Sequence, residues 1–147
     1  MTPKTWGKYF WYTIHLTALG YSEKPTFEDK IAYKSFYESI GKVLPCKKCT
    51  INFARHFADM PIDPYLIHGK RKLFDWTVYL HNTVNKELGK PQWNTDYAWD
   101  FYKTMCKNGT NAAERHPTSH GVNHTYNILV VINLLIIMLV VYRLMKN

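Results

Sequence analysis

The chain has 147 residues, which suits one compact domain with a short appendage and argues against two domains. Its formal net charge of +8 favours an anionic partner such as nucleic acid, an acidic membrane surface or an anionic cofactor. In residues 1–106, however, 15 Lys or Arg residues are scattered among 10 Asp or Glu residues without a nucleic-acid motif, so no nucleic-acid binding is expected. Aromatic residues make up 16% of the chain, which either a planar ligand or ordinary helix packing explains.

The cysteines and the N-terminus indicate the compartment. Three cysteines are too few for a disulfide-stapled secreted scaffold, and the N-terminus lacks the charged start, apolar run and cleavage site of a signal peptide. We therefore expect the soluble part of the chain to mature on the cytosolic side.

Two helices are predicted before the first cysteine. The first begins at Thr2-Pro3, where a cap residue precedes a proline at the first helical position, and it continues to Gly20. The second begins at Thr26, and Asp29 completes a box-like cap. Its apolar residues recur at roughly helical spacing, at Phe27, Ile31, Tyr37, Ile40 and Leu44.

Pro45 marks the start of a third segment. It either ends the second helix or occupies the first turn of a third helix that runs to about Ala58. The second arrangement places Cys46 near a helix N-terminus.

Residues 60–64 contain two prolines and break the helical pattern. A fourth helix is predicted from about Lys70 to Leu88, ending at Gly89 and Pro91. Asn94 then caps a short fifth helix that carries Tyr97, Phe101 and Met105. Because strand signals are absent, the predicted fold for residues 1–106 is all-α, a four-helix bundle with a short fifth helix.

The pattern of the C-terminal part predicts a membrane anchor. Residues 107–125 are polar and predict a linker, and residues 126–142 form a run without charge. A helix rises ~1.5 Å per residue, so this run is about the shortest that spans a bilayer, and we expect a transmembrane helix followed by a short tail at 143–147. A buried core helix is the alternative. A tail anchor that leaves the domain in the cytosol, on a host or virion membrane, is the expected topology.

Cys46-Lys47-Lys48-Cys49 is the first motif with evident chemistry. A thiolate at a helix N-terminus is favoured by the helix dipole and by neighbouring lysines, so this spacing predicts a reactive pair. Structural zinc would need two more ligands, for which the chain offers no recognisable second pair, and no metal site is expected. Covalent haem attachment would need a histidine where Thr50 stands.

Two further clusters combine polar and aromatic residues on helical faces. His81, Asn85 and Leu88 fall at i, i+4 and i+7 of the fourth helix, while Trp11 and His15 lie one turn apart in the first. Taken singly, each cluster also fits an ordinary solvated face or core.

Together the three clusters resemble the Erv/ALR family of FAD-dependent sulfhydryl oxidases. The resemblance runs from Trp6 to about Cys106 and rests on Gly7-Lys8-X-X-Trp11-X-X-X-His15, Pro45-Cys46-X-X-Cys49 and a third motif. That third motif, His81-Asn82-X-Val84-Asn85-X-X-Leu88-X-Lys90, is much more specific than the cysteine spacing.

The resemblance implies a helical bundle that holds FAD noncovalently, as a homodimer. It implies that four residues surround the adenine: Trp11, His15, His81 and Asn85. It implies that the following also line the cofactor: Gly7, Lys8, Tyr37, Asn82, Val84, Leu88, Lys90 and Trp93. Lys8 replaces the family arginine, which keeps the positive charge but loses the planar fork.

The resemblance also implies the reaction. A dithiol protein or thiol carrier would reduce the Cys46–Cys49 disulfide at the more accessible Cys46, Cys49 would pass the electrons to FAD, and oxygen would become peroxide. The chain lacks the second, shuttle cysteine pair and the structural disulfide of many cellular members, and it looks like the minimal versions of large cytoplasmic DNA viruses. In those viruses the family supports disulfide formation in virion proteins.

Other readings stay open at this point. A noncatalytic membrane-anchored helical scaffold predicts a colourless protein, and a zinc-binding module predicts loss of the fold on chelation. Cys106 is a leftover thiol, either buried or spare, or engaged in an intersubunit or substrate-relay disulfide.

Overall fold

The structure, a computed structural model, describes residues 2–113, and every regular element in this range is a helix. The all-α prediction is therefore confirmed for the described part of the chain. The rest of the predicted linker, the predicted transmembrane helix at 126–142 and the tail at 143–147 lie outside it. The elements are α1 (Pro3–Leu19), α2 (Phe27–Lys42), α3 (Lys47–Asp59), α4 (Asp63–Leu66), α5 (Lys70–Glu87) and α6 (Thr95–Ala113).

Local side-chain chemistry explains where several helices begin and end. At α2 the predicted capping box is confirmed, because Thr26 accepts from the Asp29 backbone N–H and the Asp29 carboxylate accepts from that of Thr26. The Asn94 side chain accepts two backbone N–H groups of the first turn of α6. Gly89 adopts a φ of +64°, and the Lys90 N–H reaches the Asn85 carbonyl at 2.8 Å in a Schellman-type end to α5.

Two predicted features of the chain are corrected. The fifth helix of the prediction is α6, which is 19 residues long rather than short, so residues 107–113 of the predicted linker are helical. Gly109 is the only strong helix breaker in that stretch, and a single interior glycine costs a helix only about 1 kcal/mol. The proline-rich break also contains the single helical turn of α4.

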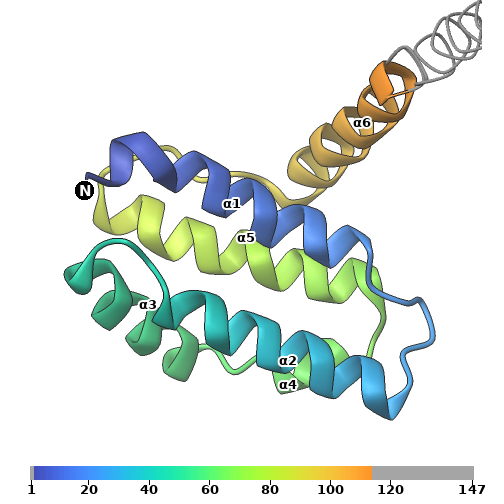
Figure 1. Cartoon of the computed structure of the whole chain (residues 1–147), viewed down its shortest axis with the longest axis horizontal. Helices are drawn as coiled ribbons and strands as arrows, with labels where there is room; N and C mark the ends of the chain where they lie inside the picture. The colour runs from blue at the N-terminus through green and yellow to red at the C-terminus, as the bar shows by residue number, and fades with distance from the viewer. Residues whose placement is uncertain (1, 114–147) are drawn as a thin grey trace, which may run out of the picture. The chain divides into compact units, whose positions relative to one another are not determined.

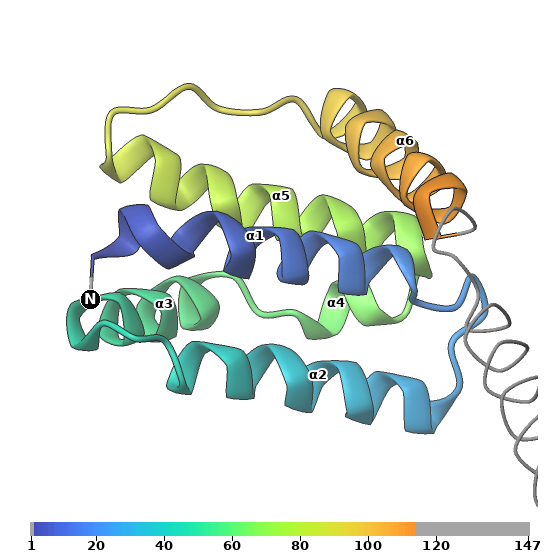
Figure 2. The same cartoon turned by 45° about the horizontal axis from the view of Figure 1, so that its top comes forward.

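The core forms where α1 lies antiparallel along α5, as Figures 1 and 2 show. The buried face of α5 supplies several of its large members, including the fully buried Trp76 and Phe74. Trp76 donates its indole N–H to the Met60 carbonyl at 3.0 Å, and Tyr37 of α2 packs edge-on against its ring. Burying side chains of this size supplies much of the stability of a small domain.

This packing brings three helix ends together. In both views α3 lies near the end of the bundle where α1 begins and α5 finishes. Two residues of α3 bind one carboxylate of α5: Arg55 forms an ion pair with Glu87, and His56 Nε2 lies 3.2 Å from its second oxygen. The N-terminus of α3, the first turns of α1 and the last turns of α5 therefore share one end, here called the cysteine end. Within residues 2–113 no helix is both long enough and apolar enough to cross a membrane.

Candidate active site

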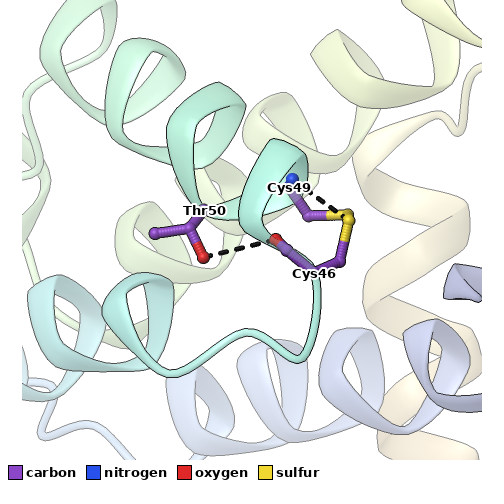
Figure 3. Close-up of a disulfide and its surroundings, with 3 residues drawn as sticks. All are labelled: Cys46, Cys49 and Thr50. Carbon is purple, nitrogen blue, oxygen red and sulfur yellow. Dashed lines mark hydrogen bonds between the residues drawn. A yellow bond between two sulfur atoms is a disulfide. The ribbon is translucent and has the colours of Figure 1, made fainter. Parts of the chain in front are cut away.

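The centre of the candidate site is a disulfide between Cys46 and Cys49, whose Cα atoms are 5.1 Å apart (Figure 3). Cys46 is the N-cap of α3, and its sulfur accepts a hydrogen bond from the Cys49 backbone N–H at 3.2 Å. The predicted location at a helix N-terminus is thus confirmed. The positive end of the helix dipole stabilises negative charge at this sulfur once the disulfide is opened.

The surroundings of the disulfide are partly open to solvent. Both cysteines are half-buried, so burial alone does not distinguish which sulfur a substrate reaches first. Lys47 and Lys48 are exposed, and Thr50 donates its hydroxyl to the Cys46 carbonyl at 3.4 Å. The site therefore combines an accessible disulfide with a cationic surface.

The second part of the site is an aromatic stack between α1 and α5. The rings of Trp11 and His81 are nearly parallel, with centroids 3.9 Å apart and an interplanar angle of 8°. His15 lies one turn beyond Trp11, and its Nε2 is 3.1 Å from Nδ1 of His81. The structure thus brings together three of the residues that the sequence assigned to an adenine site.

A hydrogen-bond chain fixes the proton positions of the two histidines. The Thr77 hydroxyl donates to the Phe74 carbonyl at 2.7 Å, so its oxygen accepts from Nδ1–H of His15 at 2.8 Å. Nε2 of His15 then carries the lone pair that accepts from Nδ1–H of His81. Nε2 of His81 is consequently left as an acceptor at the end of the chain.

The environment keeps both imidazoles neutral. Burial, and then the neighbouring His81, lower the pKa of His15 from 6.5 to about 3. Burial, followed by repulsion from Lys90, lowers the pKa of His81 to about 4. The hydrogen-bond chain requires a neutral His15, because a second proton on its Nε2 would face Nδ1–H of His81.

The Asn82 side chain makes a paired contact with the backbone of Trp93. Its amide N–H donates to the Trp93 carbonyl, and its amide oxygen accepts the Trp93 backbone N–H, both at 2.8 Å. This paired contact fixes the connection between α5 and α6 against α5. Asn82 therefore positions Trp93, whose ring lies 6.3 Å from that of Tyr102.

The remaining predicted site residues fall into three groups. Asn85 is buried on α5, with 5% of its surface exposed. Tyr37 is fully buried, and its hydroxyl donates to the Ile14 carbonyl at 3.0 Å, so it supports α1 from the core. The others lie toward the surface. A Cβ added at Gly7 would meet no atom within 4 Å. Lys8, Leu88 and Lys90 are exposed, and Val84 is half-buried.

Sequence reasoning missed two residues of this site. Thr77 lies one turn before His81, a spacing that was visible in the sequence, but its partner His15 is 62 positions away. Tyr102 of α6 lies against His15 with ring centroids 4.7 Å apart and is only 3% exposed. No local pattern pairs α6 with α1, so this contact comes from tertiary packing alone.

Two other predicted features concern thiols and metals. Cys106 is a free thiol and is exposed, so the buried alternative for this residue is wrong. Among the described residues no group of three His, Cys, Asp or Glu side chains is close enough to hold a metal ion.

The fold and site define an all-helical domain with a Cys-X-X-Cys disulfide at a helix N-terminus and a Trp–His stack between α1 and α5. The sequence pattern of the Erv1 / Alr family matches residues 8–116, and the chain belongs to this family.

Named relatives agree with this membership. The chain is 43% identical over 90 residues to the "Probable FAD-linked sulfhydryl oxidase" of Acanthamoeba polyphaga mimivirus, a match covering 61% of this chain and 63% of the relative. The chain thus spans just under two thirds of that relative. It is 30% identical to the FAD-linked sulfhydryl oxidase of African swine fever virus, covering 68% of this chain and 78% of that protein. The solved FAD-binding domain of Erv1 from Saccharomyces cerevisiae superposes with a TM-score of 0.62 at 26% identity, over 74% of this chain and 97% of that one.

The side chains present fit FAD on their own chemistry. The Trp11–His81 stack offers flat apolar surface of the kind that a purine ring covers. Nε2 of His81 is an acceptor, which suits the amino group of adenine. The indole N–H of Trp6 is buried without a hydrogen-bond partner among the described residues, so a donor is available for an oxygen-rich ligand.

Proposed function

We propose that this protein is an FAD-dependent sulfhydryl oxidase that makes disulfide bonds. The observation that carries the proposal is the Cys46–Cys49 disulfide at the N-terminus of α3, in the same bundle whose helices α1 and α5 form the Trp11–His81 stack. The family match and the names of the viral relatives support it.

Four residues are proposed to hold the adenine end of the cofactor: Trp11, His15, His81 and Asn85. Stacking and the lone pair on His81 support this assignment. Lys8 and Lys90 are proposed to face the pyrophosphate, since both are exposed cations and Lys90 is close enough to shift the pKa of His81. Gly7, Val84, Leu88 and Trp93 complete the lining, while Asn82 and Tyr37 act through Trp93 and Ile14.

The protein's own chemistry is thiol–disulfide exchange. A substrate thiolate attacks the sulfur of Cys46, the Cys46–Cys49 bond breaks, and Cys49 leaves as a thiolate. The second substrate thiol loses its proton and attacks the substrate sulfur of the mixed disulfide, which completes the substrate disulfide and releases Cys46. One electron pair has then passed from the substrate dithiol to the cysteine pair. FAD, when bound, supplies the acceptor for this electron pair and its transfer to oxygen as hydrogen peroxide.

The setting of the enzyme follows from the same proposal. We infer a homodimer that acts on a dithiol protein or a thiol carrier and supports disulfide formation in virion proteins, as the viral relatives suggest. The uncharged run at 126–142 supports a C-terminal membrane anchor with the catalytic domain in the cytosol.

The test is the visible absorption spectrum of the purified full chain in detergent, before and after dithiothreitol is added without oxygen. We expect a flavin band that bleaches with dithiol and returns in air. A Cys49→Ser variant should keep the band and lose the bleaching. A colourless protein that cannot be reconstituted with FAD would contradict the proposal and favour a structural scaffold.

A further inference from the structure

The surface around the disulfide carries an excess of positive charge that the reaction itself does not require. Five exposed lysines lie in the helix ends that meet at the cysteine end: Lys4, Lys42, Lys47, Lys48 and Lys86. No ion pair involving any of them is found within residues 2–113, although the same structure pairs Lys34, Lys70 and Arg71 with carboxylates. These lysines are additional to Lys8 and Lys90, which the proposed function places at the cofactor.

Negative charge is almost missing from this end. Residues 2–20 contain no Asp or Glu, residues 38–59 contain only Glu38 and Asp59 at their two ends, and residues 80–94 contain only Glu87. The Glu87 carboxylate is already taken up by Arg55 and His56. Acidic residues instead gather toward the opposite end, at Glu23, Glu28, Asp29 and Asp63. The molecule therefore presents a positive potential where the disulfide is accessible.

Thiolate stabilisation explains only part of this charge. Lys47 and Lys48 lie inside the cysteine motif, where they favour the thiolate form. Lys42 ends α2, and Lys86 lies near the end of α5, so neither belongs to the motif. Four chain steps separate Lys42 from Cys46, which limits the distance between their Cα atoms to roughly 14 Å. That distance suits the flanking residues of a bound peptide.

The same surface exposes aliphatic side chains on both sides of the disulfide. Val43, three positions before Cys46, is 68% exposed, and Ile51, two positions after Cys49, is 61% exposed. Ile51 lies one turn from both Lys47 and Lys48, on the exposed face of α3. Exposed apolar side chains with polar side chains around them match the apolar centre and polar rim of a protein interface.

From these observations we infer that the cysteine end is a docking surface for an acidic dithiol protein. Its substrate presents the cysteines in a segment whose flanking residues include Asp or Glu and at least one aliphatic side chain. The lysines steer and orient this segment, and Val43 and Ile51 contact its apolar residue. The inference rests on the proposed oxidase function and names the substrate class of that site.

The experiment compares three peptides that share one Cys-X-X-Cys core, flanked by acidic, neutral or basic residues, and uses uncharged dithiothreitol as the reference dithiol. Oxygen consumption by the full-length, FAD-loaded chain in detergent gives kcat/KM for each. We expect the acidic peptide to exceed the neutral one by about tenfold at low ionic strength and to lose that advantage as salt rises. The dithiothreitol rate should respond to salt much less than the rate with the acidic peptide, because its only charge is that of the attacking thiolate.

Matched charge reversals test the location of the surface. Lys42→Glu with Lys86→Glu removes positive charge from the cysteine end, and Lys24→Glu with Lys72→Glu makes the same net change at exposed positions toward the other end. Only the first pair should abolish the preference for the acidic peptide, while both leave dithiothreitol oxidation unchanged.

Three outcomes would overturn the inference. The first is equal kcat/KM for the acidic and neutral peptides, and the second is an equal loss of preference in both variants. The third is the absence of peptide discrimination together with weaker co-sedimentation of the Lys42/Lys86 variant with phosphatidylserine vesicles, which would assign the charge to a membrane surface. A chain that cannot oxidise dithiothreitol would instead refute the oxidase function itself.

Discussion

Nε2 of His15 lies 3.1 Å from Nδ1 of His81, and this contact joins the two helices that carry the aromatic part of the site. The direction of the hydrogen bond is set by Thr77, which accepts from the other nitrogen of His15. A residue that touches only His15 therefore determines which atom His81 presents beside Trp11.

Replacing Thr77 with valine should separate this role from simple packing. Thr77→Val keeps the side-chain shape but leaves Nδ1–H of His15 buried without an acceptor, which costs about 1–3 kcal/mol. We expect a lower free energy of unfolding in urea and a smaller fraction of bound flavin after gel filtration. Thr77→Ser should restore both. Equal stability and flavin content in the Val and Ser variants would contradict the assignment.

The low pKa values of the histidine pair predict destabilisation in mild acid. In the unfolded chain both histidines take up protons near pH 6.5, whereas the folded state resists protonation until about pH 3 for His15 and about pH 4 for His81. The stabilising contribution is therefore complete above pH 6.5 and is lost as the pH falls toward 4. Each unit of difference between the folded and the unfolded pKa of a histidine corresponds to at most about 1.4 kcal/mol of unfolding free energy.

Urea unfolding at pH 7, 6 and 5 measures this effect, because few carboxylates titrate in that range. The free energy of unfolding should fall with pH in the native chain and much less in a His15→Gln/His81→Gln variant. His68→Gln, at an exposed position, is the control and should retain the native slope. A flat profile in the native chain would show that the pair is not held neutral.

Asn82 is predicted to control the connection between α5 and α6. Asn82→Ala removes both hydrogen bonds to Trp93 and should lower the unfolding free energy by about 1–3 kcal/mol. Amide hydrogen exchange at Trp93 should rise by one to two orders of magnitude, since its N–H loses its acceptor. Asn82→Asp keeps an acceptor for that N–H and should protect it more than Ala does. Unchanged amide hydrogen exchange at Trp93 in Asn82→Ala would contradict this role of Asn82.

Two glycines should respond in opposite ways to the same substitution. A Cβ at Gly41 would overlap the ring of Phe53, so Gly41→Ala must displace α3 from α2 and should destabilise the fold by about 1–3 kcal/mol.

Gly7→Ala meets no atom within 4 Å and should stabilise α1 by about 0.5–1 kcal/mol. If Gly7 also lies against the cofactor, that variant combines a stable fold with reduced flavin retention. Thermal unfolding and the visible spectrum measure the two effects separately.

Local chemistry made the helices of this fold predictable. Thr26, Asn94 and Gly89 each fix a helix end through hydrogen bonds to residues within a few positions, so the sequence alone locates those ends. The length of α6 was underestimated because a polar composition suggested irregular chain, although Gly109 and its polar neighbours do not stop a helix.

The site was predictable where the motif residues meet each other and not where they meet other residues. Trp11, His15 and His81 were identified correctly as neighbours. The partners Thr77 and Tyr102 follow only from the packing of α1 against α5 and α6, which spacing along the chain does not encode. For the same reason the sequence did not reveal that both ends of the Asn82 amide bind Trp93.

The contacts of Arg55 and His56 with Glu87 join two helices. Because both residues bind the last residue of α5, the helix that carries the disulfide is held against the helix that carries His81. A partner covalently attached to Cys46 is therefore attached to a helix that is itself held against α5. In the proposed reaction the cysteine pair therefore keeps its position relative to the helix that carries His81.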